Sequence, residues 1–178
     1  MKKENIPNAL TLLRIAFIPL FVLLLSLGNP SLHLWAGLIF MVASITDYLD
    51  GYLARKWQVV TNFGKFADPM ADKLLVMSAL ILLIELGYAP AWVVVVIICR
   101  ELAVTGLRLL LVENDGEVLA AALPGKIKTF TQMLAIIFLL FHWVVVGQIF
   151  LYISLIATVY SGYDYFKGAS FLFKDTFK

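Results

Sequence analysis

The chain has 178 residues, of which 62% are hydrophobic and 15% charged, and its formal net charge at pH 7 is +2. A typical soluble domain is about half apolar and a quarter charged. The core of a 178-residue chain cannot bury the additional apolar side chains found here. We therefore expect much of the surface to face lipid, and the small net charge gives no reason to expect a nucleic-acid partner.

Six segments are apolar and long enough to cross a bilayer, which takes about 20 residues of helix. In chain order they are residues 6–27, 32–57, 61–87, 91–112, 127–146 and 148–166. Turn-forming glycine, proline and asparagine occur in the breaks at residues 28–30, 87–90, 114–116 and 124–125. With no long linker between the segments, the sequence predicts one all-α domain over residues 1–178, a polytopic membrane protein with six transmembrane helices.

Lysines gather on one side of this predicted arrangement. If the N-terminus is cytosolic, the cytosolic ends carry Lys2, Lys3, Lys56, Lys65, Lys126, Lys128, Lys167, Lys174 and Lys178. The turns expected outside the cell, near residues 28–32, 87–91 and 146–148, contain no lysine or arginine. Because cytosolic loops are enriched in basic residues, this pattern predicts a multi-pass protein of the cell membrane with an N-in/C-in topology.

Four aspartates lie inside the apolar segments, Asp47 and Asp50 in the second and Asp68 and Asp72 in the third. A carboxylate at membrane depth is costly and usually faces a cavity, a partner or an ion. Spacings of three and four residues place each pair on one helical face. An antiparallel hairpin of the two segments about residues 58–61 brings residue 47 level with 72 and residue 50 level with 68. We therefore expect the four carboxylates to converge in the cytosolic half of the membrane.

Such a cluster indicates a metal site. Four carboxylates in one pocket repel each other unless cations are present, and oxygen ligands suit Mg²⁺ or Mn²⁺. Two ions per site would stabilise the attacking and leaving oxygens of a displacement at phosphorus. The alternative interpretation is pairing along one helix, for example Asp72 with Lys73 or Asp50 with Arg55.

The aspartates belong to a longer motif with fixed spacing. Its defining positions are Asp47, Asp50, Gly51, Ala54, Arg55, Gly64, Asp68 and Asp72. The motif resembles the signature of the CDP-alcohol phosphotransferases, and every defining position matches. The resemblance implies a membrane enzyme with six transmembrane helices, commonly a homodimer, that binds a CDP-linked lipid and an alcohol and releases CMP.

The same resemblance implies roles for individual residues. The four aspartates would hold two divalent ions against the pyrophosphate, and Asp72 would also act as the base that deprotonates the attacking hydroxyl. The residues implied to bind the CDP-lipid are Asn8, Gly51, Ala54, Arg55, Thr61 and Gly64.

Basic residues in the fourth and fifth segments bear on the acceptor alcohol. Arg100, Arg108 and Lys126 are candidate ligands for the phosphate of a water-soluble acceptor, with Lys128 beside them. Three alternatives remain open: the lysines serve only as interfacial anchors, Arg100 pairs locally with Glu101, or Arg108 is an interfacial residue too.

Three further segments, residues 5–14, 100–108 and 125–129, are similar to the branch of the family that makes phosphatidylglycerophosphate. That branch joins CDP-diacylglycerol to sn-glycerol 3-phosphate and releases CMP. Because the aspartates are expected in the cytosolic half of the membrane, we expect the active site to face the cytoplasm. Branches that make cardiolipin, phosphatidylserine or phosphatidylinositol phosphate keep the same aspartates and are alternatives, although a basic pocket disfavours serine. A cation transporter is the alternative from a different class of protein. Many transporters have broken helices, but here the turn residues lie between the apolar segments and not inside them.

Overall fold

The computed structural model describes residues 5–57, 62–113 and 123–170, all of which lie in helices or the short turns between them. Within these ranges, the side chains of residues 5–8, 48, 50–57, 62–69, 109, 112 and 113 lie outside the described part. The helices are α1 (Asn5–Ser26), α2 (Pro30–Trp57), α3 (Asn62–Glu85), α4 (Ala91–Glu113), α5 (Leu123–Leu140) and α6 (Val144–Gly168). Each predicted segment corresponds to one helix, so the all-α prediction is confirmed.

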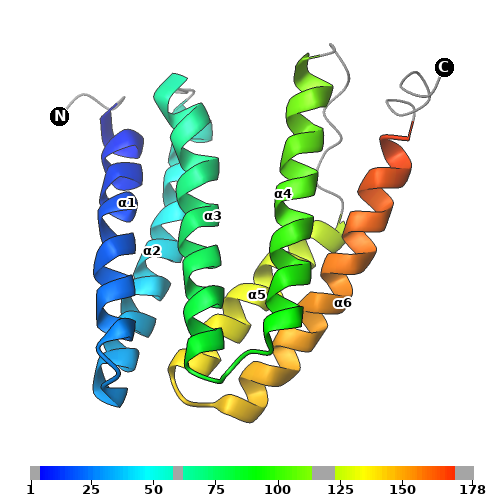
Figure 1. Cartoon of the computed structure of the whole chain (residues 1–178). Coiled ribbons are helices and arrows are strands. Elements are labelled where there is room, and N and C mark those ends of the chain that lie inside the picture. Colours follow the sequence, from blue (N-terminus) through cyan, green and yellow to red (C-terminus); the bar gives the residue numbers. More distant parts are fainter. Residues whose placement is uncertain (1–4, 58–61, 114–122, 171–178) are drawn as a thin grey trace.

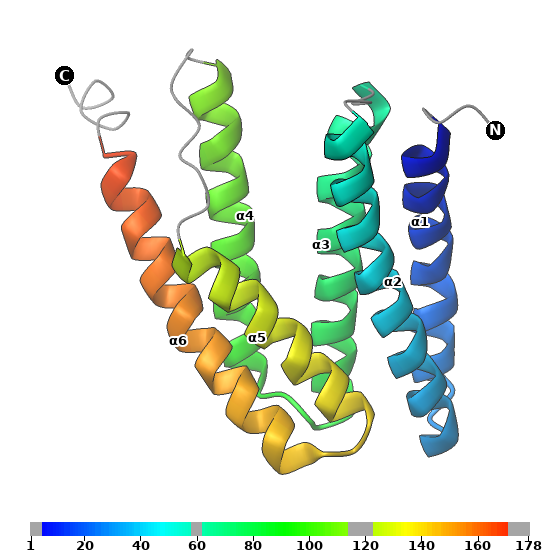
Figure 2. The same ribbon diagram turned by 180° about the vertical axis from the view of Figure 1, so that it is seen from behind.

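The apolar stretches of three helices are long enough to cross a membrane. Among the described residues they are Ala9–Ser26, Leu123–Leu140 and Val144–Gly168. In space, α1 packs against α2 and α3, α5 and α6 form a tightly packed antiparallel hairpin, and α4 packs against α6 (Figures 1 and 2). The start of α1 and the end of α6 lie at the same end of the bundle, and the α1–α2, α3–α4 and α5–α6 turns lie at the other (Figure 1).

The buried apolar core lies in the half of the bundle nearest those three turns, which we call the apolar end. Phe21, Phe40, Leu83, Ile97 and Leu139, from five different helices, are all fully buried there. We call the opposite half, which holds the start of α1 and the end of α6, the charged end. A smaller apolar cluster between α4 and α6 continues into the charged end. Burying apolar side chains between the helices at one end leaves the other end free to hold polar groups.

The position of the α5–α6 turn corrects the sequence-based prediction. The predicted turn at residues 146–148 contains Gly147, but the chain turns at residues 141–143, where His142 has a φ of 62°. Gly147 instead lies buried inside α6, where an added Cβ would come within 2.6 Å of the Leu139 side chain. This glycine therefore allows close packing of two helices, a role that the sequence does not distinguish from turn formation.

The predicted break at residues 124–125 also falls inside a helix. Helix α5 begins at Leu123, so Pro124 lies in its first turn. Proline is tolerated there because the first backbone N–H groups of a helix have no partner within the helix.

Candidate active site

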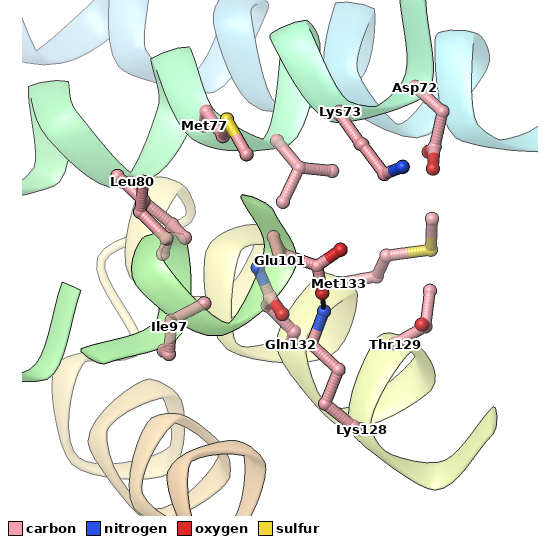
Figure 3. A pocket seen from close by; sticks show the side chains of 12 residues that line it. Asp72, Lys73, Met77, Leu80, Ile97, Glu101, Lys128, Thr129, Gln132 and Met133 are labelled. Carbon is pink, nitrogen blue, oxygen red and sulfur yellow. Dashed lines mark hydrogen bonds and ion pairs between the residues drawn. The ribbon is translucent and has the colours of Figure 1, made fainter. Parts of the chain in front are cut away.

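Asp72 and Lys73 project from α3 into a cavity between α3, α4 and α5, which extends from the charged end to the apolar core (Figure 3). This small cavity has a volume of about 40 Å³. Its polar wall residues are Asp72, Lys73, Glu101, Lys128, Thr129 and Gln132. Apolar side chains of α3, α4 and α5, among them Leu80, Ile97 and Met133, form the rest of the wall. The cavity therefore joins a carboxylate to basic and amide groups within an apolar shell.

A second, larger cavity adjoins the first. It has a volume of about 190 Å³ and is lined mainly by α3, α4 and α6. The residues that line both cavities are Asp72, Lys73, Glu101 and Thr129. The large cavity adds Arg100, Arg108, Thr105, Asp164 and Tyr165. Arg100 and Arg108, predicted as phosphate ligands, are thus brought into the same space as Asp72.

Glu101 neutralises two of the basic residues. The Lys128 ammonium donates a hydrogen bond to Glu101 Oε1, and the Arg100 guanidinium lies 3.4 Å from the same oxygen (Figure 3 draws the lysine contact). Lys128 is buried, so this partner compensates a charge that would otherwise be costly to remove from water. The predicted alternative of a local Arg100–Glu101 pair is therefore also present in the structure.

Lys73 and Arg108 are held differently, by hydroxyl groups. Lys73 Nζ donates a hydrogen bond of 2.6 Å to Thr105 Oγ1, which connects α3 to α4. Arg108 Nε donates one of 3.1 Å to the Tyr165 hydroxyl, and its guanidinium lies 5.3 Å from the centre of the Tyr165 ring. Among the described side chains, neither cation has a carboxylate at ion-pair distance. A hydroxyl orients a cation without neutralising it, so both keep their charge available for an anion.

Arg14 of α1 pairs with one of the four aspartates. Its guanidinium lies 2.6 Å from Asp47 Oδ1, and the arginine side chain is only 1% exposed. This ion pair joins α1 to α2, while the register that would place residue 47 level with residue 72 stays a prediction.

Several predicted residues fall outside the described side chains or ranges: Asn8, Asp50, Gly51, Ala54, Arg55, Thr61, Gly64 and Asp68. Among the residues that the structure describes, no three acidic, histidine or cysteine side chains converge. The four-aspartate metal site and the CDP-lipid site therefore stay predictions. The chemistry of the two described donors, Asp47 and Asp72, fits a hard divalent cation because both supply carboxylate oxygens.

The two lysines at the start of α5 have different surroundings. Lys126 is exposed and lies outside the walls of both cavities, so its predicted phosphate contact stays a prediction. Lys128, considered both as part of a cationic pocket and as an anchor, is buried in the wall of the small cavity.

Sequence reasoning gave no role to Tyr165 and Gln132, considered Lys73 only as a pairing partner of Asp72, and included Arg14 only as part of the motif over residues 5–14. Two of these carried a usable signal. Arg14 is a lone charge inside an apolar segment, the same feature that singled out the aspartates. Gln132 lies four residues after Lys128, and therefore on the same helical face.

The fold and the site together define a helical membrane protein with a carboxylate and several cations gathered in a polar pocket at one end of its helices. The chain belongs to the CDP-alcohol phosphatidyltransferase family, which it matches over residues 4–160. The family resemblance inferred from the aspartate motif is therefore confirmed, and with it the class of protein: a transferase of phospholipid biosynthesis.

Relatives that cover nearly the whole chain carry closely similar names. A CDP-diacylglycerol–glycerol-3-phosphate 3-phosphatidyltransferase of Bacillus subtilis (strain 168) is 48% identical, over 92% of this chain and 94% of the relative. A protein of the same name from Rickettsia bellii (strain RML369-C) is 40% identical, over 93% and 95%. A probable phosphatidylglycerophosphate synthase of Mycobacterium tuberculosis (strain ATCC 25618 / H37Rv) is 43% identical, over 93% and 81%.

Proposed function

We propose that this protein transfers the phosphatidyl group from CDP-diacylglycerol to sn-glycerol 3-phosphate, giving phosphatidylglycerophosphate and CMP. The observation that carries the proposal is the large cavity, in which Lys73 and Arg108 lack carboxylate partners among the described side chains while Asp72 lines the same wall. A phosphorylated alcohol supplies the anion for the two cations and the hydroxyl for the carboxylate. The names of relatives at 40–48% identity support the same acceptor.

The side chains suggest how the reaction proceeds. The acceptor phosphate binds to Arg108 and Lys73, with Arg100 beside them, and this contact orients the acceptor hydroxyl toward Asp72. Asp72 accepts the proton as the hydroxyl oxygen forms its bond to the phosphorus of the lipid phosphate. The phosphorus–oxygen bond to CMP breaks, and CMP leaves with the electron pair. Positioned general-base catalysis of this kind typically contributes about 10²–10⁴-fold to a rate.

The donor set fits a divalent metal, on which the family generally depends. We propose that two Mg²⁺ or Mn²⁺ ions are held by Asp47, Asp50, Asp68 and Asp72. When bound, the ions supply positive charge against the pyrophosphate of the CDP-lipid. The CDP-lipid itself would contact the residues named by the family motif: Asn8, Gly51, Ala54, Arg55, Thr61 and Gly64.

The arrangement in the membrane is part of the proposal. We propose six membrane crossings, both termini in the cytoplasm, the charged end facing the cytoplasm, and assembly as a homodimer. The one-sided placement of lysine supports the orientation. Single cysteines placed in the 58–61 and 28–30 turns of a cysteine-free variant test it, because only the latter should react with an impermeant thiol reagent in intact cells.

The experiment for the activity is an acceptor panel. Purified protein in detergent receives labelled CDP-diacylglycerol, Mg²⁺ and one acceptor: sn-glycerol 3-phosphate, phosphatidylglycerol, serine or inositol phosphate. We expect CMP release and a phosphatidylglycerophosphate product with glycerol 3-phosphate alone. Faster turnover with another acceptor would reassign the protein within the family, and absence of CMP release with every acceptor would return the transporter alternative to consideration.

A further inference from the structure

Gln132 on α5 is buried, and no described residue forms a hydrogen bond with its side-chain amide. Its side chain lines the small cavity, and the residue is only 2% exposed. Within the described part of the chain, neither its Nε2 nor its Oε1 has a partner. Buried amides in native proteins are nearly always hydrogen-bonded, so a pair of unpartnered atoms points to a group that binds there.

The surroundings of Gln132 place that group beside the proposed base. Figure 3 shows the amide next to the Glu101–Lys128 ion pair, in the wall of the cavity that Asp72 and Lys73 also line. Glu101 and Lys128 pair with each other, whereas the Gln132 amide has no partner among the described residues and can bind a further polar group. The cavity of about 40 Å³ has room for a small polar group. One water molecule needs roughly 10–15 Å³ measured in this way.

We propose that Gln132 is a specificity-determining residue whose amide binds the second, non-reacting hydroxyl of the acceptor. This rests on the proposed function, in which the acceptor phosphate binds Lys73 and Arg108 and the reacting hydroxyl meets Asp72. Asp72 and Lys73 line both cavities, so an acceptor held in this way extends to the mouth of the small one. A hydroxyl both donates and accepts a hydrogen bond, which matches the NH₂ and carbonyl groups of an amide.

The consequence is selection for a phosphorylated polyol over a phosphorylated simple alcohol. A buried polar group that pairs with a substrate hydroxyl rejects the analogue that lacks this hydroxyl, because the protein group is then left without a partner. An apolar side chain at position 132 would bind the two compounds with little difference.

The test compares two acceptors that differ by one hydroxyl. Propane-1,3-diol monophosphate keeps the phosphate and the primary hydroxyl of sn-glycerol 3-phosphate but lacks the secondary hydroxyl. We expect the wild type to prefer glycerol 3-phosphate in kcat/KM by at least about tenfold. Gln132→Met has similar length and no amide, so it should lose most activity toward glycerol 3-phosphate, keep its activity toward the analogue, and bring the ratio close to one.

Gln148→Met is the matched control, since Gln148 lies on α6 at the apolar end and donates its amide hydrogen bond to the Tyr88 carbonyl. It should keep the wild-type ratio even if the protein is less stable, because a ratio of two acceptors does not depend on the folded fraction. Should Gln132→Met fail to fold, Gln132→Glu supplies the same readout and should reduce the ratio in part, because it keeps only acceptor atoms.

The outcomes separate this inference from the proposed function. A wild type that turns over both acceptors equally, or a Gln132→Met variant that keeps the wild-type ratio, overturns the role of Gln132 and leaves the proposed function standing. A wild type that uses neither acceptor but transfers the phosphatidyl group to an alcohol without phosphate overturns both.

Discussion

The two ends of the helical bundle are built from different chemistry. At the apolar end, residues such as Phe21, Phe40 and Leu139 are fully buried against neighbouring helices. At the charged end, the same helices carry Arg14, Asp47, Asp72, Lys73, Arg100, Glu101, Arg108, Lys128 and Asp164. Packing at one end fixes how the helices are spaced at the other, where they surround two cavities instead of filling the space with side chains.

The contrast between the two ends shows which part of the sequence favours stability and which part does not. Lys73 and Arg108 have hydroxyl partners in place of carboxylates, and Gln132 has no partner among the described residues. Such groups are unfavourable for folding and become favourable when a substrate binds. Substitutions at the charged end should therefore change catalysis more than stability, and those at the apolar end should do the reverse.

Removing divalent metal should have the largest effect, a complete loss of CMP release. The aspartates need bound cations to remain ionised together and to approach the charged pyrophosphate. Dialysis against a chelator followed by an assay of labelled CMP checks this, and adding back Mg²⁺ should restore the rate. Full turnover after exhaustive chelation would contradict the metal site.

Replacing Arg108 should affect one substrate. Arg108→Ala should raise the KM for glycerol 3-phosphate by about 10- to 100-fold, since a hydrogen bond to a charged group contributes about 1.5–3 kcal/mol. The KM for CDP-diacylglycerol should change little. Arg108→Lys should also be harmful, because lysine cannot reproduce the planar contact with Tyr165 and a two-point phosphate contact. Equal changes for both substrates would remove Arg108 from the acceptor pocket.

A smaller effect is expected at Tyr165, which acts through Arg108. Tyr165→Phe keeps the aromatic ring beneath the guanidinium and loses only the hydroxyl that accepts from Nε. We expect the KM for glycerol 3-phosphate to rise about 2- to 10-fold, as for loss of one hydrogen bond of about 0.5–1.5 kcal/mol. Steady-state kinetics should show no further rise when Tyr165→Phe is combined with Arg108→Ala. Additive effects would mean that Tyr165 acts on its own.

The smallest effect on turnover is expected at the apolar end. In Gly147→Ala, the new methyl group would overlap the Leu139 side chain, so the free energy of unfolding should fall by about 1–3 kcal/mol. Thermal unfolding in detergent measures this, while kcat per folded molecule should stay near the wild-type value. Gly106→Ala is the control, because an added Cβ there meets nothing within 4 Å and should not destabilise the helix. Equal melting temperatures for the two variants would contradict the tight α5–α6 contact.

Much of this arrangement could be predicted from the sequence because a membrane imposes strong rules. Span length indicated six helices, and charges at membrane depth indicated the aspartates. The predicted position of the α5–α6 turn was wrong because a glycine such as Gly147 can allow either a turn or close helix packing. The contacts of Lys73 with Thr105 and of Arg108 with Tyr165 join different helices. Which helices are neighbours is decided by tertiary packing, which spacing along one chain does not reveal.

The kcat of Asp72→Asn, measured with saturating substrates and Mg²⁺, tests the central claim most directly. The substitution keeps the shape of the side chain and removes the basic oxygen that is proposed to take the acceptor proton. We predict a folded variant that still binds CDP-diacylglycerol and metal but has a kcat lower by about 10²–10⁴-fold. A near-normal kcat, or a defect that excess Mg²⁺ fully restores, would contradict the assignment of Asp72 as the base.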